Sequence, residues 1–278
     1  MSIRNNYKHT LTASYFGYIT QAIVNNFAPL LFVTFQRSFG ISLEKIAGLV
    51  TVNFFMQLVV DLACAKFIDR IGYRVSIVAA HLFAGAGLIM LGTLPFALPD
   101  PYIGLLISIG FYAVGGGLIE VLISPIVEAC PTDKKSAAMS LLHSFYCWGH
   151  VAVILLTTLF FVTAGIKNWH FLAYLWAIIP FANAVYFCLV PINSLAAEGG
   201  AAPMKELFKS KLFWILAVLM VCSGASEQAM SQWSSAFAEA GLKVSKTVGD
   251  LLGPCMFAIL MGLSRVLYAA FSEKIKLT

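Results

Sequence analysis

The strongest constraint on this sequence is a series of eight apolar runs, each long enough to cross a lipid bilayer as a helix. A bilayer core of about 30 Å is crossed by roughly 20 helical residues. Short connectors with charged and turn residues separate the runs, so the pattern predicts an all-α polytopic membrane protein. The expected spans are residues 11–35, 47–66, 75–96, 102–127, 137–163, 170–191, 212–235 and 249–271.

The composition excludes a soluble protein and gives no sign of enzyme chemistry. Apolar residues make up 60% of the chain and charged residues 11%, whereas soluble domains have roughly 45–50% and about 25%. The six cysteines stand singly in apolar runs, which predicts neither disulfides nor a zinc module. Hydrolase and phosphate-loop motifs are absent from the sequence, so we expect neither an enzyme nor an ATP-driven pump, and no cofactor.

The distribution of basic residues predicts the orientation in the membrane. Thirteen of the 18 Lys and Arg residues, Arg265 among them, fall at one side of the predicted spans, and five fall at the other. By the positive-inside rule, the thirteen and both ends of the chain face the cytoplasm, which predicts an inner (plasma) membrane protein. This topology explains the net charge of +5, so no nucleic-acid partner is expected.

The longest hydrophilic stretch divides the spans into six and two. It covers residues 193–211 and contains an Ala/Gly-rich segment that is typical of a flexible linker. We therefore expect a six-helix bundle over 1–192, a cytoplasmic linker over 193–211, and a partial bundle of two helices over 212–278. A short repeat agrees with a six-span period, because an acid–base pair in Ala65–Ile71 recurs 204 residues later in Ala269–Ile275.

The first of these two loops resembles a known motif. The stretch Asp69–Arg74 is similar to the loop that follows the second span in the major facilitator superfamily, with Ala65 where that family has Gly. The resemblance implies two six-helix halves in parallel repeat, and a transporter that works by alternating access. Because that fold has twelve spans, an eight-span chain is expected to be a fragment or a truncated product. The resemblance also implies a cytoplasmic gating loop, whose residues are Asp69, Arg70, Gly72 and Arg74. The alternative is that the basic residues of this stretch only set the topology.

A narrower resemblance lies in the fourth predicted span. Gly115–Glu120, followed by Ser124 and Pro125, is similar to a segment of fucose-permease-like sugar:proton symporters. That resemblance implies a sugar as the solute and a proton as the coupling ion. The sequence departs from the pattern at Ser124, where those proteins have Asn, and in the first span, which carries amides in place of a carboxylate.

Carboxyl groups inside membrane spans are costly and are therefore candidates for function. Glu120 follows three glycines, which leave room for a neighbouring helix or a solute, and its low-dielectric surroundings favour a group that gains and loses a proton. The alternative is a protonated structural brace. Glu227 is a second candidate for proton coupling, at a position that also fits the membrane interface. Asp61 is a third, with bracing of Arg74 or of a neighbouring backbone within the bundle as the alternative.

Uncharged polar residues in the spans are candidates for solute contact. Amides and an indole are typical of sugar recognition, because amides bond hydroxyls and an aromatic face packs on a ring. In lipid, the same side chains also join helices or anchor an interface. A metal site at His143, Cys147 and His150 lacks a fourth ligand and is not expected. The candidate solute contacts are Gln21, Asn25, Asn26, His143, Gln228 and Trp233.

Together these features predict a secondary transporter that moves a small polar solute, a sugar first, by proton symport. The expected partners are that solute, protons and the lipid bilayer, and a monomer is expected. A drug:proton antiporter would have a larger and more apolar pocket. A membrane receptor or scaffold without transport would be expected to carry larger loop domains than this chain has.

Overall fold

A computed structural model describes residues 3–131, 135–193 and 208–271, and every regular element in these ranges is a helix. Eight helical stretches are long and apolar enough to cross a membrane, which confirms the predicted all-α polytopic fold. Most of the expected linker over 193–211 lies outside the described residues. The eight stretches are Tyr7–Phe39, Leu43–Cys64, Tyr73–Ala97, Pro101–Glu128, Ala138–Ala164, Ile166–Leu189, Lys211–Gly241 and Lys246–Leu267.

The first span follows the short 3-10 turn η1 (Ile3–Asn5) and is broken into three segments: α1 (Tyr7–Asn26), the 3-10 turn η2 (Ala28–Leu31) and α2 (Phe32–Phe39). Pro29 lies in the turn, where its missing N–H and its ring interrupt the helical hydrogen bonds. The segment ends at Gly40, whose φ of +65° is a left-handed conformation that favours glycine.

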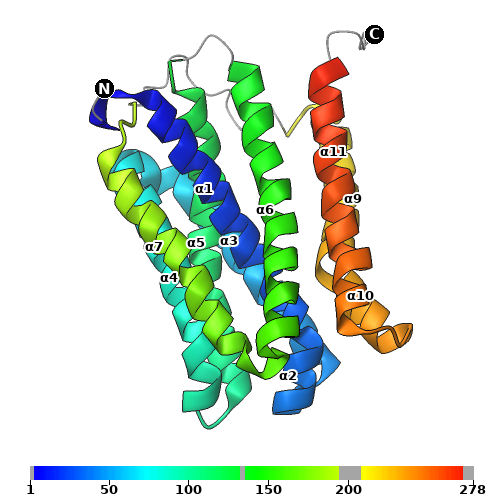
Figure 1. Cartoon of the computed structure of the whole chain (residues 1–278). Helices are drawn as coiled ribbons and strands as arrows, with labels where there is room; N and C mark the ends of the chain where they lie inside the picture. The colour runs from blue at the N-terminus through cyan, green and yellow to red at the C-terminus, as the bar shows by residue number, and fades with distance from the viewer. Residues whose placement is uncertain (1–2, 132–134, 194–207, 272–278) are drawn as a thin grey trace.

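The next five spans are continuous helices: α3 (Leu43–Ile71), α4 (Tyr73–Ala97), α5 (Pro101–Glu128), α6 (Lys135–Ala164) and, after the 3-10 turn η3 (Ile166–Asn168), α7 (Trp169–Leu189). They alternate in direction (Figure 1). We call the end that holds the start of α1 the Tyr7 end, and the end that holds the end of α2 the Gly40 end.

Close packing of these helices depends on small residues. Helix α5 packs along α4 and α3, while α1 lies against α5 and α6. A Cβ atom on Gly87 of α4 would lie 2.4 Å from the backbone N of Tyr112 on α5, which is too close for any side chain. Gly115 on α5 has the same role toward α4, since its Cβ would lie 2.5 Å from the carbonyl oxygen of Ala80.

The last two spans are α9 (Lys211–Gly241) and a composite of α10 (Lys246–Asp250), a π-helical turn η4 (Leu251–Cys255) and α11 (Met256–Phe271). Figure 1 shows α11 in front of α9, and α11 packs against α6. The buried residues of α9 are Ser231, Gln232 and Ser235, all in its second half. Its first half exposes large apolar side chains, so the contacts of α9 with η2 and α2 are made toward the Gly40 end.

Candidate functional site

A cavity of about 360 Å³ lies among six helices and is lined mainly by polar side chains. Helices α1, α3, α5 and α6 provide most of the lining, and α9 and α11 close it from the other side. The lining residues are Tyr18, Gln21, Asn25, Phe54, Gln57, Leu58, Asp61, Glu120, His143, Tyr146, Glu227, Gln228 and Arg265.

An amide network forms the wall shared by α1, α3 and α5. The Nε2 of Gln57 donates to the Oδ1 of Asn25 at 2.9 Å, and the Nδ2 of Asn53 donates to the same oxygen at 3.4 Å. The Nε2 of Gln21 donates to the Oε2 of Glu120 at 3.3 Å and to the Oε1 of Gln57 at 3.4 Å. The network therefore holds the Glu120 carboxyl group beside amides that offer both donors and acceptors.

The glycines that precede Glu120 place its helix close to α1 and α3. A Cβ atom on Gly117 would lie 3.0 Å from the Cα of Gln57, and one on Gly116 would lie 3.2 Å from the Oε1 of Gln21. Glycine at both positions lets α5 approach closely enough for the two glutamines to reach the cavity wall. The carboxyl group of Glu120 is exposed toward the cavity and does not point only at neighbouring helices.

Charged groups on four helices also line the cavity. Asp61 on α3 and Glu227 on α9 are close enough to Glu120 on α5 to act on it electrostatically. Arg265 on α11 is the positively charged residue in the lining. Buried acceptors on Asp61, Gln21 and Gln228 have no donor among the described residues. A buried acceptor left unpaired costs about 1–3 kcal/mol, so these groups favour a bound polar partner such as water or a solute.

Two tyrosines and a histidine complete the wall formed by α1 and α6. The ring of Tyr18 lies 5.5 Å from the ring of His143, measured between centroids, and its hydroxyl lies 3.0 Å from the Oγ of Ser124. The hydroxyl of Tyr146 accepts a long hydrogen bond of 3.5 Å from the Nδ2 of Asn26. This wall combines ring faces with hydroxyl groups, which suits a small partly polar molecule.

The sequence model of the Major Facilitator Superfamily matches residues 14–277. The chain belongs to the Major Facilitator Superfamily. No curated protein sequence matches the chain. Members of this superfamily are transporters, so the protein is a multi-pass membrane transporter. Its first six spans form the N-terminal six-helix bundle, and its last two correspond to the first two helices of the C-terminal bundle.

Solved structures of other transporters share this fold at low sequence identity. The crystal structure of a D-xylose-proton symporter has a TM-score of 0.67 and 16% identity, over 96% of this chain and 68% of that one. A peptide transporter POT has a TM-score of 0.65 and 14% identity, over 95% and 69%. A POT family transporter with a thioalcohol-conjugated peptide has a TM-score of 0.59 and 16% identity, over 96% and 69%. At these identities the similarity shows the fold alone.

Seven of the nine candidate proton-coupling and solute-contact residues of this Major Facilitator protein line the cavity. The other two, Asn26 and Trp233, lie between helices. Asn26 accepts a hydrogen bond of 2.7 Å from the Oγ of Ser231 and donates to the carbonyl of Ala22 at 2.9 Å. The ring of Trp233 packs on that of Phe32, with centroids 5.2 Å apart. The contacts with Ser231 and Phe32 join the first span to α9, and neither Asn26 nor Trp233 lines the cavity.

The predicted gating loop is shorter in the transporter than the motif suggests. Only Gly72, with a φ of +90°, separates α3 from α4, so the motif lies at two helix ends. The guanidinium of Arg74 donates to the carbonyl oxygens of Phe187 at 2.7 Å and Cys188 at 3.2 Å, and not to the expected carboxylate. Arg70 is exposed, and the side chain of Asp69 lies outside the described residues. The alternative of a brace between Asp61 and Arg74 is not realised, since Arg74 bonds these carbonyls and Asp61 lines the cavity.

Sequence reasoning missed Arg265, Tyr18, Gln57 and Tyr146 as cavity residues. Arg265 was assigned to the cytoplasmic charges because it stands near the end of its apolar run, yet the transporter places it in the cavity wall. A signal was available, because six residues of the predicted span follow it and an arginine at that depth is costly in lipid. The tyrosines gave no such signal, since aromatic residues occur throughout the spans.

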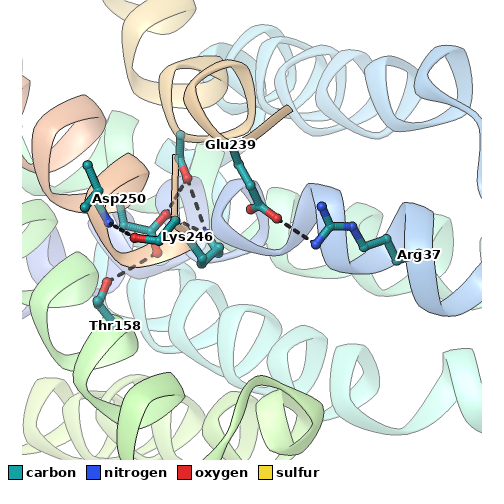
Figure 2. Close-up of polar contacts among 8 residues, drawn as sticks. Arg37, Thr158, Glu239, Lys246 and Asp250 are labelled. Atoms are coloured by element: carbon teal, nitrogen blue, oxygen red, sulfur yellow. Dashed lines mark hydrogen bonds and ion pairs between the residues drawn. The ribbon is translucent and has the colours of Figure 1, made fainter. Parts of the chain in front are cut away.

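A second group of polar contacts lies at the Gly40 end, away from the cavity. The guanidinium of Arg37 on α2 pairs with the carboxylate of Glu239 on α9 at 2.9 Å (Figure 2). The side chain of Arg37 is 70% exposed, whereas that of Glu239 is 9% exposed. This ion pair links the first span to the seventh.

Asp250 provides the second link at this end. It is completely buried, and its Oδ1 accepts from the Nζ of Lys246 at 2.5 Å and from the hydroxyl of Ser235. Its Oδ2 accepts from the Oγ1 of Thr158 on α6 at 3.3 Å (Figure 2). The buried charge is therefore paired within α9 and α10 and also bonded across to the six-helix bundle.

Proposed function

We propose that this transporter moves a small polar solute across the inner (plasma) membrane together with protons, by alternating access. The observation that supports the proposal best is the cavity, where the amide network holds Glu120 at a wall that also carries Asp61 and Glu227. Ionisable groups beside a cavity within the membrane are suited to carrying protons while a solute occupies the same space.

The two sets of helices would move against each other around this cavity. In our proposal residues 1–192 and 212–278 are the moving units, joined by a linker over 193–211, and one copy of the chain forms the unit of transport. Their described polar contacts include Arg37 with Glu239 and Thr158 with Asp250 at the Gly40 end, and the bonds of Ser231 and Gln232 to Asn26 and Asn25 beside the cavity. The first half of α9 buries no side chain at the Tyr7 end. We infer that the Gly40 end is the closed one.

The orientation follows from the basic residues. Without Arg265, the topology predicted from the sequence puts twelve Lys and Arg residues on the side of Arg4, Lys8 and Arg74, which the structure places at the Tyr7 end, against five on the side of Arg37 and Lys45. By the positive-inside rule the Tyr7 end faces the cytoplasm and the closed Gly40 end faces outward. Arg70 and Arg74, on either side of Gly72, would then act at the cytoplasmic face during the closing movement.

Glu120 is the proposed proton carrier. When it is ionised, the Nε2 of Gln21 stabilises its Oε2. When it is protonated, its O–H becomes a donor, for which the unpaired Oε1 of Gln21 is an acceptor on the same side chain. Both states therefore have a partner, which suits a group that changes protonation during transport. Asp61 and Glu227 would share this role by acting electrostatically on Glu120.

The amide groups of the cavity are the proposed solute contacts. Gln21, Asn25 and Gln228 offer donors and acceptors to hydroxyl groups, with His143 at the aromatic wall. A sugar is the first solute to test, and the D-xylose-proton symporter of the same fold supports that choice. A drug:proton antiporter is the second candidate, because Phe54, Leu58 and the tyrosine rings add apolar surface to the cavity.

The test is uptake into proteoliposomes with an imposed proton gradient. The variant Glu120→Gln removes the titratable group and keeps the hydrogen bond from Gln21, so proton-driven accumulation should be lost while exchange of solute down its gradient remains. The matched control is Glu128→Gln, an exposed carboxyl group at the end of the same helix. If Glu120→Gln accumulates solute as the unmodified protein does, the proposed role of Glu120 is wrong.

A further inference from the structure

Arg265 is the feature of the cavity that the proposed function leaves unused. It lies on α11, which packs against α6, and its charge acts on Tyr18, His143 and Cys147. The ion pairs among the described residues are Arg37 with Glu239 and Lys246 with Asp250, so Arg265 has no carboxylate partner within 4.0 Å in that part of the chain.

The carboxyl groups lie on other helices of the same cavity. Asp61 and Glu120 stand on α3 and α5, which pack against each other, and Glu227 stands on α9. Asp61 and Glu227 both act electrostatically on Glu120. The cavity therefore has the guanidinium of Arg265 and the carboxyl group of Glu227 on the side of α9 and α11, and the carboxyl groups of Asp61 and Glu120 on the α3–α5 side. No ion pair among the described residues joins the two sides.

A guanidinium within the membrane is expensive unless it is paired or solvated. Its five N–H donors form a planar fork that matches the two oxygens of a carboxylate. A side-chain carboxylate of the cavity would serve if it paired with this fork, but among the described residues no carboxylate lies within 4.0 Å of the Arg265 guanidinium. A carboxylate on the solute fits this position, while the opposite wall of acids fits a positively charged group.

The geometry points to a zwitterionic solute of amino-acid or short-peptide size, with its carboxylate on Arg265 and its ammonium group toward Asp61 and Glu120. This inference rests on the proposed transport function and narrows its solute. A purely anionic solute would meet three carboxyl groups, and a purely cationic one would leave Arg265 unpaired. A neutral sugar satisfies the amides and leaves both charged walls without partners. A cavity of about 360 Å³ is large enough for a molecule of this size.

The test is equilibrium binding to the purified full-length chain in lipid nanodiscs. The standard L-amino acids, L-alanyl-L-alanine, D-xylose and D-glucose are first compared by thermal stabilisation. The zwitterion that binds best is then measured by calorimetry beside its carboxyl methyl ester and its N-acetyl derivative. We expect the parent molecule to bind at least about tenfold more tightly than either derivative, since each derivative leaves one charged wall unpaired.

Variants of Arg265 test whether this residue causes the difference in affinity between the zwitterion and its derivatives. Arg265→Gln should weaken binding of the zwitterion by about tenfold or more and leave binding of its methyl ester within about twofold, because the ester has no carboxylate to lose. Arg265→Lys should restore part of the difference. The control is Arg4→Gln, an exposed arginine near the start of the chain, which should bind as the unmodified protein does.

The outcomes separate this inference from the proposed function. The inference is overturned if no zwitterion binds, if the zwitterion and its derivatives bind equally well, or if D-xylose or D-glucose binds and Arg265→Gln has no effect. Those results leave proton-coupled transport standing. If a zwitterion binds as expected but shows no proton-driven uptake, the proposed function fails and the assignment of the solute class remains.

Discussion

Replacing Thr158 with valine should loosen the Gly40 end, which we infer to be closed, without disturbing either set of helices internally. The Oγ1 of Thr158 donates to the Oδ2 of Asp250 at 3.3 Å, and this bond crosses from α6 to α10. Valine keeps the shape of threonine and removes the donor. Asp250 retains its bonds to Lys246 and Ser235, so the folding of α9 and α10 should be little affected.

The magnitude follows from the charge and the length of this bond. Hydrogen bonds to charged groups contribute roughly 1.5–3 kcal/mol, and a donor–acceptor distance of 3.3 Å belongs at the weak end. A loss of about 1.4 kcal/mol changes an equilibrium constant by about tenfold. We therefore expect Thr158→Val to reduce the ratio of closed to open Gly40 ends by about tenfold.

The assay is a distance measurement between spin labels on Glu44→Cys and Lys243→Cys, two exposed positions on opposite sides of the Gly40 end. The exposed Cys188 and Cys222 are replaced by serine beforehand. Thr158→Val should increase the population with the longer distance. The control is Thr157→Val, where the lost partner is the indole of Trp176 on α7, within the six-helix bundle. An unchanged distribution in Thr158→Val, or the same change in both variants, would refute the reasoning.

Two further predictions concern stability, read from thermal unfolding in detergent. Gly87→Ala places a Cβ 2.4 Å from the backbone N of Tyr112, so α4 and α5 must separate. We expect the free energy of unfolding to fall by about 1–3 kcal/mol. An unfolding midpoint equal to that of the unmodified protein would contradict this packing. Arg37→Gln removes the ion pair with Glu239, but the arginine side chain is 70% exposed, so the cost should stay below about 1 kcal/mol. A larger loss would mean that this pair is less solvated than its exposure indicates.

The spans were predictable because each depends only on the length and composition of one continuous stretch of sequence. A run of apolar residues of sufficient length must be helical in lipid whatever it packs against, so the first predicted run, 11–35, falls within the observed Tyr7–Phe39. Most of the helices extend beyond the predicted apolar runs because polar residues at a helix terminus continue the helix without entering the membrane; α7 is an exception, since it ends at Leu189, before the predicted end at residue 191. The same reasoning treated residues 69–74 as a loop, whereas only Gly72 leaves the helical conformation.

The direction in which each polar side chain points was less predictable. Asn25 and Asn26 are adjacent and chemically identical, yet a rotation of about 100° per residue sends Asn25 into the cavity and Asn26 toward Ser231 on α9. The sequence records neither the rotation of a helix nor its neighbours. Trp233 failed as a prediction of a cavity residue for the same reason, and Arg265 failed because depth was judged from the nearer end of its run.

The interruption at Pro29 gives the first span two separate attachments. Its α1 segment carries Gln21 and Asn25 in the cavity wall, while its α2 segment carries Arg37, which is bound to Glu239. A helix broken by proline bends there more easily than an intact one. If α9 moves as we propose, α2 can follow it for some distance while α1 keeps its contacts with α5. The ion pair at the Gly40 end and the cavity wall that carries Gln21 then need not move as one rigid rod.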